Sequence, residues 1–431
     1  MSESLPLHVG IDDTDSKKGM CTTYVGAVAI TRLREAGFQT IGFPKLIRLN
    51  PNIKWKTRGN CAISFSISSP GRRLEEAKRI VLKTVAELAE LEEKNTTPGV
   101  AFLSSQEIPK ELVDFSKRVV RDVIEIEEAE AVAEEVGAEL HKFKLGRGVV
   151  GALAAIGHPL DTDPTFELIA YRTPENRGKP RKVDEASVVE MNRKTFPRTF
   201  DNLDPFTREI RITPHTPCPI LYGIRGETPE AVEEAAQMVR VFEPIEQTII
   251  YKTNQATDEH LIPAKISEIT PGRSYSVNVK VISRPKVIPG GHVIFRVADE
   301  TGEMDCAAYE PTRGFRDVVR QLLPGDLLVV HGGVKDKEGL PLTLNLEKLE
   351  VIELAKPTIK RNPLCESCGK RMKSEGRGKG YSCKKCGRKA PPSAAETIKI
   401  ERHLPTGFFE VPPRARRHLS RPLIRMKTPE H

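Results

Sequence analysis

Three carboxylates lie close together near the N-terminus, at Asp12, Asp13 and Asp15, directly after a short apolar run at residues 7–11 that is typical of a β-strand. Like charges at this spacing repel one another, so their ionised forms are costly to bring together unless a cation neutralises them. Mg²⁺ carrying a nucleotide phosphate would do so, because hard cations take oxygen ligands. A solvated Asp-rich turn is the alternative, and the neighbouring residues favour the metal–nucleotide interpretation.

The next residues predict a helix over 21–35, because apolar residues recur there at helical spacing. Thr22 and Thr23 stand at its start, where backbone N–H groups and the helix dipole favour an anion. Helix capping by either threonine is the alternative explanation. Beside the carboxylates, these hydroxyls favour a nucleotide site.

Residues 44–60 are basic and contain no acidic residue. They include five cations and the single tryptophan of the chain: Lys45, Arg48, Lys54, Lys56, Arg58 and Trp55. Cations and carboxylates together resemble the two halves of a metal–triphosphate site, and basic residues interleaved with an aromatic side chain suit stacking on a base. A solvated basic face is the competing interpretation.

The string GRGVVG at residues 146–151 has the form GxGxxG, follows a predicted strand and opens a helix of small residues, with Glu167 lying 21 positions beyond the first glycine. We interpret it as a phosphate-binding turn, because Arg147 within the turn suggests direct contact with phosphate. A close-packed glycine turn is the main alternative. A third interpretation, a nicotinamide-dependent oxidoreductase, is supported by this motif alone. The chain has no GxxxxGK[ST] string, so an ATP site here would not be a P-loop.

Four cysteines form two CxxC pairs, Cys365 with Cys368 and Cys383 with Cys386, separated by fourteen residues rich in Gly and Lys. Each pair offers two thiolates from one tight turn, and zinc prefers four such ligands in a tetrahedron. A redox CxxC would need a βαβ setting that this basic segment lacks. Because cysteine fills all four positions, the predicted zinc is structural.

The 431 residues exceed the roughly 100–200 residues of one ordinary core, which predicts several domains. Residues 357–431 carry 19 Lys and Arg against 6 Asp and Glu, a net charge of +13, so the remaining residues sum to −5 of the total of +8. This asymmetry suggests a polyanion held at the basic end, with a solvated basic tail as the alternative. The absence of a long apolar stretch or an export signal, with isolated cysteines, predicts a cytoplasmic protein without a membrane partner.

Strands alternate with helices along residues 1–145 and again along 146–258, which predicts two successive α/β or α+β units. Residues 259–356 differ: five β-type segments, with one short helix between the third and the fourth, follow the order of an OB-fold barrel. A barrel of SH3 type is the alternative, and the inserted helix argues against it.

Several long and uncommon strings in this chain resemble those of one enzyme family, the archaeal isoleucine-tRNA 2-agmatinylcytidine synthetases, TiaS. The resemblance runs from about residue 7 into the tail and is carried by the barrel, the paired CxxC and the strings GIDDTDSKKGMCTT, FPKLIRLNPN, KTRGN, GRGVVGALAAIG, FELIAYR, TPHTPCPILYGIRGE and PRARRHL. It implies a multidomain α+β fold with four domains: a kinase-like α/β catalytic domain at 1–145, a ferredoxin-like domain at 146–258, an OB-fold β-barrel at 259–356 and a zinc ribbon at 357–392. A basic C-terminal tail at 393–431 follows them.

The resemblance also implies a reaction. Members of the family join agmatine to carbon 2 of the wobble cytidine of the minor isoleucine tRNA with a CAU anticodon, using ATP that ends as AMP and pyrophosphate, so that the anticodon reads AUA. The oxygen on carbon 2 is a poor leaving group, so it is first phosphorylated on a flipped-out base, and the primary amine then displaces the phosphate. The implied partners are this tRNA and agmatine, and the implied cofactors are ATP, Mg²⁺ and structural Zn²⁺. A non-catalytic binder of single-stranded nucleic acid, built from an OB fold and a zinc ribbon, is the alternative.

Residue by residue, the resemblance makes Thr22, the first threonine after Cys21, the catalytic threonine, and it assigns Asp12, Asp13 and Asp15 to the ATP–Mg²⁺ site. It assigns seven positions to the nucleotide-binding wall: Lys45, Arg48, Arg58, Asn60, Gly146, Arg147 and Gly148. Agmatine is a dication, so we expect acids and aromatic groups at its slot. The candidates are Asp161, Glu167, Tyr171 and Asp201.

Overall fold

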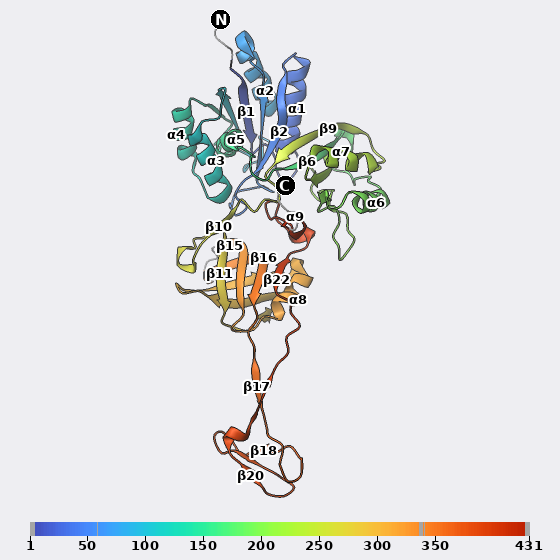
Figure 1. Ribbon diagram of the computed structural model, residues 1–431. Helices are drawn as coiled ribbons and strands as arrows, with labels where there is room; N and C mark the ends of the chain where they lie inside the picture. Colours follow the sequence, from blue (N-terminus) through green and yellow to red (C-terminus); the bar gives the residue numbers. More distant parts are fainter. Residues whose placement is uncertain (1–4, 58, 336–338, 340, 427–431) are drawn as a thin grey trace.

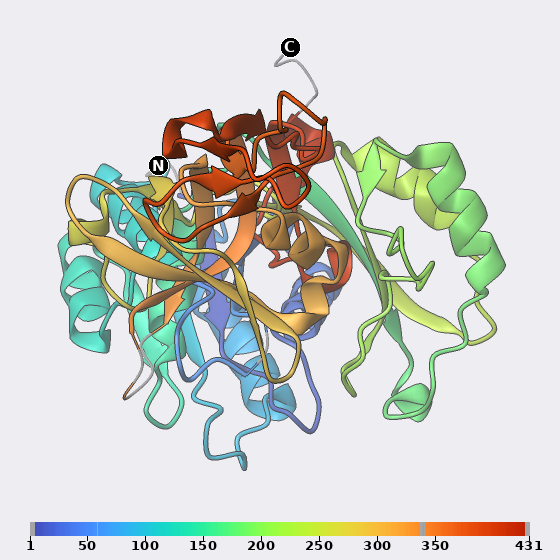
Figure 2. The ribbon, with the colours of Figure 1, turned by 90° about the horizontal axis from the view of Figure 1, so that it is seen from below.

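The computed structural model describes residues 5–57, 59–335, 339 and 341–426 of the chain. Three bodies follow one another along its length: a mixed α/β body, a β-barrel below it, and a small ribbon at the end of a two-stranded stalk (Figure 1). Viewed from below, α3 (Lys110–Arg121) and α4 (Ile126–Val136) flank the barrel on one side, while α6 (Glu185–Thr195) and α7 (Pro229–Met238) flank it on the other (Figure 2).

One nine-stranded sheet runs through the whole α/β body, in the order β5-β4-β1-β3-β2-β9-β6-β8-β7. Its strands are β1 (Leu7–Asp12), β2 (Thr40–Arg48), β3 (Cys61–Ile67), β4 (Gly99–Ser104), β5 (Glu139–Lys142), β6 (Thr165–Arg172), β7 (Thr199–Phe200), β8 (Ile220–Gly226) and β9 (Ile245–Thr253). The two predicted N-terminal units meet where β2 pairs in parallel with β9, with Lys45 in register with Lys252. They therefore share one sheet.

Helices cover both faces of this sheet because alternate residues of a strand point to opposite sides. In β4, Val100 and Phe102 join the core beneath α1 (Thr22–Glu35) and α2 (Leu74–Leu88), whereas Ala101 and Leu103 join the core beneath α3, α4 and α5 (Gly148–Gly157). A separate core lies between β6, β8 and the helices α6 and α7.

Helix α5 belongs in space to the first predicted domain, although the predicted boundary places it at the start of the second. It packs against β1, where a Cβ on Gly10 would collide with the carbonyl of Ala152, and against β4, where a Cβ on Gly99 would collide with Val149. Glycines at these crossings allow the helix to lie directly on the strand backbone.

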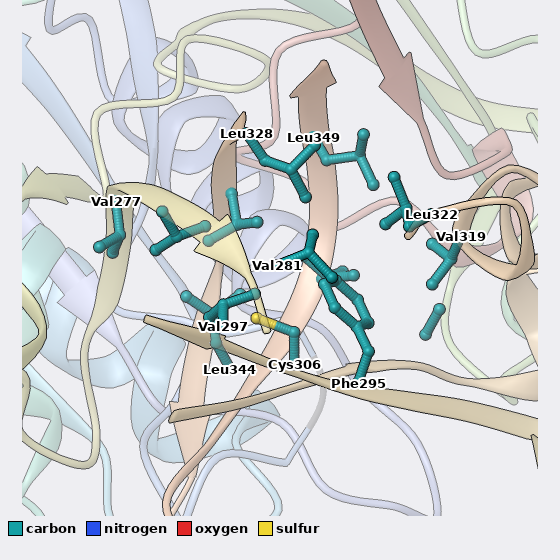
Figure 3. Close-up of a cluster of buried hydrophobic side chains, with 14 of the residues drawn as sticks. Val277, Val281, Phe295, Val297, Cys306, Val319, Leu322, Leu328, Leu344 and Leu349 are labelled. Carbon is teal, nitrogen blue, oxygen red and sulfur yellow. The ribbon is translucent and has the colours of Figure 1, made fainter. Parts of the chain in front are cut away.

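Residues 274–353 form a closed five-stranded barrel, as the five β-type segments of the sequence predicted. Its strands are β11 (Ser274–Val281), β13 (His292–Ala298), β14 (Glu303–Ala308), β15 (Leu327–Lys335) and β16 (Thr343–Glu353), with α8 (Gly314–Arg320) between β14 and β15; β10 (Leu261–Pro263) and β12 (Lys286–Ile288) extend it. The pairing of β11 with β13 closes the circuit. Its interior is filled by branched aliphatic side chains around Phe295, with Val319 and Leu322 closing one end (Figure 3).

The ribbon is joined to the barrel by β17 (Thr358–Arg361) and β21 (Glu396–Lys399), which pair antiparallel as a stalk (Figure 1). Beyond the stalk, three two-residue strands form a small sheet: β18 (Lys373–Ser374), β19 (Tyr381–Ser382) and β20 (Lys389–Ala390).

The basic segment after the ribbon folds back over the molecule. β22 (Gly407–Glu410) pairs with β16 of the barrel, and α9 (Leu423–Met426) returns to the α/β body. Arg425 anchors it there: its guanidinium is buried and lies 2.7 Å from Asp163 Oδ1 and 2.7 Å from Glu227 Oε1. Among the described residues, no helix has the length and apolar character needed to cross a membrane.

Candidate functional site

A cavity of about 450 Å³ lies where three parts of the chain meet: the first half of the sheet, its second half and the segment that follows the ribbon. Eight of the eleven predicted catalytic and nucleotide-binding residues line it: Asp12, Asp13, Asp15, Thr22, Arg48, Asn60, Arg147 and Gly148. Lys45 and Gly146 lie outside it, and Arg58 lies outside the described residues.

The carboxylates stand at the end of β1 and in the turn that follows. The N–H of Asp13 donates to Asp12 Oδ1 at 2.7 Å, and the N–H and hydroxyl of Thr97 donate to Asp13 Oδ2 at 2.9 and 2.8 Å. Asp13 has a φ of 59°, a left-handed conformation that Asp tolerates better than most residues. The turn is therefore held by specific hydrogen bonds and is not a loose solvated loop.

The electrostatics of this turn suit a cation. Burial raises the pKa of Asp12 well above its usual value, and the neighbouring carboxylate of Asp13 raises it further. Burial also raises the pKa of Asp13 to about 6, against the hydrogen bonds from Thr97. A divalent cation would reverse both shifts by favouring the ionised oxygens, and the donor set of buried carboxylates fits Mg²⁺.

Thr22 is the first residue of α1 and is buried, with its hydroxyl accepting a hydrogen bond from the hydroxyl of Thr14 at 3.2 Å. The N-cap position is occupied by Cys21, and the helix has no side-chain cap. The capping explanation for Thr22 and Thr23 therefore does not apply to this structure. Thr22 lines the same cavity as the three carboxylates.

The GRGVVG turn packs closely against Asp12. A Cβ on Gly148 would lie 2.6 Å from the carbonyl oxygen of Asp12. The N–H groups of Gly148, Val149 and Val150 all donate to backbone carbonyls, at 3.0, 3.1 and 3.2 Å. These amides are already satisfied, so the structure supports the close-packed turn and offers no backbone cradle for phosphate at these three positions.

Arg147 is the charged side chain that this turn contributes to the cavity. Its guanidinium stacks over the ring of Trp55, 3.9 Å from the ring centre, and forms an ion pair with Glu125 at 3.0 Å. Gly146, with a φ of +69°, lies against the side chain of Lys142. The stack joins the basic loop to the start of α5, where both residues line the cavity.

The basic loop divides between the cavity and the scaffold. Lys45 donates to the carbonyls of Ile156 and His158 at 3.2 and 2.6 Å, at the C-terminal end of α5, and burial lowers its pKa to about 8. The Lys45 ammonium therefore binds the carbonyls at the C-terminal end of α5, which attract cations. It does not line the cavity. Arg48 does line the cavity, and Asn60 donates to the carbonyl of Asn50 at 2.8 Å.

The candidates for an agmatine slot are also divided. Asp161 is exposed and Tyr171 is buried in the core against Tyr24, and neither lines the cavity. Glu167 and Asp201 line it, but both carboxylates are already neutralised by arginine. Glu167 lies 3.8 Å from Arg48 and 3.5 Å from Arg225, and Asp201 pairs with Arg225 and Arg416.

Sequence reasoning missed the contribution of the C-terminal segment. Arg414, Arg416 and His418 line the cavity, and so does Arg225, which lies beside His418. The string PRARRHL contains Arg414, Arg416 and His418. Its spacing did not predict a site, because the residues that these side chains contact lie far away in the sequence.

The four cysteines form one cluster in the ribbon. Their Sγ atoms all lie within 4.8 Å of one another, with Cys365 and Cys386 at 3.5 Å and Cys368 and Cys383 at 3.3 Å. A tetrahedral zinc with bonds of about 2.3 Å separates its sulfur ligands by about 3.8 Å. The cluster therefore fits one zinc ion bound by four thiolates, with no position left for substrate.

A carboxylate turn and several arginines in one cavity, joined to a barrel and a four-thiolate cluster, define a class of multidomain proteins that bind metal and phosphate. Three family models match the chain: the TiaS TCKD domain over residues 8–145, the TiaS FLD domain over 146–260 and the TiaS C-terminal zinc ribbon domain over 362–404. The chain is 49% identical over 422 residues to the isoleucine-tRNA 2-agmatinylcytidine synthetase TiaS of Pyrococcus horikoshii, covering 98% of each protein. It is 45% identical over 419 residues to that of Archaeoglobus fulgidus, covering 97% of each.

Solved structures show the same relationship. A crystal structure of TiaS in complex with its isoleucine tRNA and ATP matches with a TM-score of 0.91 at 44% identity. A complex of TiaS with the same tRNA, AMPCPP and agmatine matches with a TM-score of 0.87 at 41% identity, and each structure covers 99% of both chains. The chain therefore belongs to the TiaS family of isoleucine-tRNA 2-agmatinylcytidine synthetases.

Proposed function

We propose that this protein is an ATP-dependent ligase that joins agmatine to carbon 2 of the wobble cytidine of the minor isoleucine tRNA. The observation that carries the proposal is the cavity itself, which brings Asp12, Asp13 and Thr22 together with Arg48 and other cations in a chain related to TiaS over nearly its full length. Relatives of this chain form complexes with this isoleucine tRNA, ATP and agmatine, so the same substrates apply here.

The acidic turn would hold Mg²⁺, with Asp12 and Asp13 as ligands and Asp15 completing the set. When bound there, the metal would neutralise the charge of the triphosphate and orient the group that is transferred. Thr22 lies at the N-terminal end of α1, where it contacts a phosphoryl group or carries it covalently. Arg48 and Arg147 bind the phosphate oxygens, with Asn60 beside them. ATP is split into AMP and pyrophosphate, and these two products hold all three of its phosphoryl groups. One of the two pyrophosphate groups is therefore the one that the cytidine oxygen takes up, and the other is released as phosphate. The group on the cytidine leaves as phosphate, together with the oxygen of carbon 2, when the agmatine amine forms the new C–N bond and loses a proton.

The remaining domains hold the RNA. The barrel circuit β11-β13-β14-β16-β15, with α8 between β14 and β15 along the chain, follows the OB-fold order, which suits single-stranded anticodon nucleotides. The first unit is kinase-like in its chemistry, and β6, β8 and β9 with α6 and α7 form the ferredoxin-like unit. The basic ribbon, stabilised by structural zinc, contacts the RNA backbone. We place the protein in the cytoplasm.

The test is incorporation of labelled agmatine into a minor isoleucine tRNA transcript with a CAU anticodon, with ATP and Mg²⁺ present. Incorporation at the wobble cytidine, absent when ATP is omitted, is the expected result. Active, zinc-replete protein that incorporates no agmatine would refute the proposal. Equal binding of single-stranded DNA and RNA without any response to ATP would instead favour a non-catalytic binder.

A further inference from the structure

Arg225 is held by three side chains on the wall of the cavity. It lies on β8 and is paired in register with Glu167 of β6 and with Phe200 of β7. Its Nη2 donates to Nδ1 of His418 at 2.7 Å, its Nε lies 3.5 Å from Glu167 Oε1, and its Nη1 lies 3.9 Å from Asp201 Oδ2. A guanidinium carries five N–H donors. Among the described residues, Arg225 makes one short hydrogen bond, to His418, so it keeps donors for a ligand in the cavity.

His418 is a neutral acceptor that fixes this guanidinium. Burial lowers the pKa of His418 well below 6.5, and the neighbouring cations Arg48, Arg225 and Lys56 lower it further. Because a guanidinium can only donate, Nδ1 must accept and the ring proton must lie on Nε2. The hydrogen bond therefore aims Arg225 without neutralising its positive charge.

Arg416 differs from Arg225 because both of its terminal nitrogens are already bound by the protein. It pairs with Asp201, lies 2.7 Å from Glu410 Oε1, donates to the carbonyl of Val411 at 3.3 Å, and has a side chain only 5% exposed. Its effect is to tie Asp201, and through Asp201 the Nη1 side of Arg225, to the segment that follows the ribbon.

The charge of these segments indicates the ligand class. The basic loop, the second half of the sheet and the C-terminal segment supply the cavity with six cations: Arg48, Lys56, Arg211, Arg225, Arg414 and Arg416. The same segments supply two carboxylates, Glu167 and Asp201, and both are paired with arginine. An excess of cations suits an anion and repels dicationic agmatine, and a planar guanidinium with free donors matches the oxygens of a phosphoryl group.

We propose that Arg225 binds a phosphoryl group in the transfer site, and that His418 and the Asp201–Arg416 pair are positioning residues that aim it. The proposal rests on the proposed function, because it assumes that phosphoryl transfer takes place in this cavity. It gives the segment beyond the ribbon a direct part in the chemistry. Arg225 and His418 lie 193 residues apart in the sequence. Under this proposal they act as one unit.

The main test is a double-mutant cycle with R225A and H418L, measured as kcat and KM for ATP in agmatine incorporation. R225A is expected to lower kcat/KM by about 10²-fold, as for removal of one transition-state donor, and H418L by about tenfold. Added to R225A, H418L should cost less than about twofold, because its effect passes through Arg225. Equal losses from H418L on both backgrounds would overturn the proposal.

Three further variants separate positioning from folding. H418N places an amide oxygen near the position of Nδ1 and should recover most of the activity lost in H418L. D201N, a nearly isosteric change, should lower activity in the wild-type background and have little effect beside R225A. H403L makes the same exchange at an exposed histidine of the C-terminal segment and should match wild type. Failure of H418N to rescue a folded H418L protein, or an undiminished D201N effect beside R225A, would contradict the positioning roles.

Binding assays identify the source of the phosphoryl group. A weaker affinity of R225A for ATP without tRNA assigns the contact to the nucleotide, and a weaker affinity for tRNA without ATP assigns it to the RNA. A fall in kcat alone assigns it to the transferred group. R225A with unchanged kcat and unchanged affinities would overturn the proposal, whereas a wild-type protein without incorporation would refute the proposed function itself.

Discussion

Gly151 of α5 lies directly against the carboxylate of Asp12 at the end of β1. A Cβ on Gly151 would collide with Asp12 Oδ2 and would lie 2.8 Å from Cδ1 of Leu49. The helix can approach the end of the strand this closely because position 151 has no side chain. This contact fixes where the first carboxylate of the site points, and it gives the GxGxxG string a structural reason that does not depend on a dinucleotide.

G151A is therefore expected to displace Asp12 and to lower the turnover number for agmatine incorporation by at least about tenfold, since a shift of about 1 Å near the chemistry can cost about 10²-fold. G157A is the matched control, because its Cβ would collide with Leu112 at the other end of α5. It should lower Tm and leave the turnover of the folded protein close to wild type. Equal turnover losses in both variants would contradict the role assigned to Gly151.

T22A and D12N are expected to lower turnover by at least about 10²-fold, because each removes a group from the transfer site. Their affinity for tRNA should stay within about threefold of wild type, since the RNA is held mainly by the barrel and the ribbon. Filter binding of labelled tRNA, beside the incorporation assay, measures both quantities. A parallel loss of RNA affinity in both variants would mean that the acidic turn serves RNA binding.

The carboxylate turn should make stability depend on pH. Because the folded-state pKa of Asp13 is raised to about 6, the folded protein takes up a proton that the unfolded chain has lost. This uptake occurs between about pH 4 and pH 6, so the free energy of unfolding falls as the pH rises through this window. D13N should flatten that dependence.

Mg²⁺ needs the ionised oxygens. The increase in Tm on adding Mg²⁺ should therefore be larger at about pH 7.5 than at about pH 5, where Asp13 is mostly protonated. Thermal scans of wild type and D13N with and without Mg²⁺ check this expectation. An equal Mg²⁺ effect at both pH values would argue against a metal on this turn.

C365S removes one of four thiolates and should release the zinc, because the ribbon around the cluster has a hydrophobic core of only a few residues, among them Met372 and Tyr381. The expected zinc content falls from one ion per chain towards none, and tRNA affinity falls with it. Cys306 is buried in the barrel, so C306A is the matched control and should keep its zinc. Full zinc content in C365S would refute the four-thiolate site.

Local patterns predicted the parts of this structure that depend on local physics. The two CxxC pairs of the ribbon carry ligand spacing within one short segment, and the barrel strands carry an alternation of buried and exposed residues. The carboxylate string after β1 likewise predicts a cation site from its own residues. Each of these signals lies within a few consecutive residues.

Contacts between distant segments could not be predicted in the same way. The packing of α5 on β1 depends on the contact between Gly10 and Ala152. No repeating pattern in the sequence links these two positions. The charge of Lys45 predicts a phosphate ligand. In the structure its ammonium instead binds carbonyls at the end of α5, and the sequence does not show that these carbonyls lie beside it. His418 and Arg416 reach the cavity because the chain returns from the ribbon along the barrel, a path that a basic composition does not reveal.

The central claim is that the acidic turn at Asp12–Asp13 and Arg48 of the basic loop converge on one magnesium-bound triphosphate. A crystal structure of this protein with Mg²⁺ and a non-hydrolysable ATP analogue tests it most directly. We expect the metal on the carboxylates, the triphosphate within hydrogen-bond distance of Arg48, and Thr22 beside a phosphoryl group. A triphosphate bound elsewhere, with this cavity empty, would contradict the account.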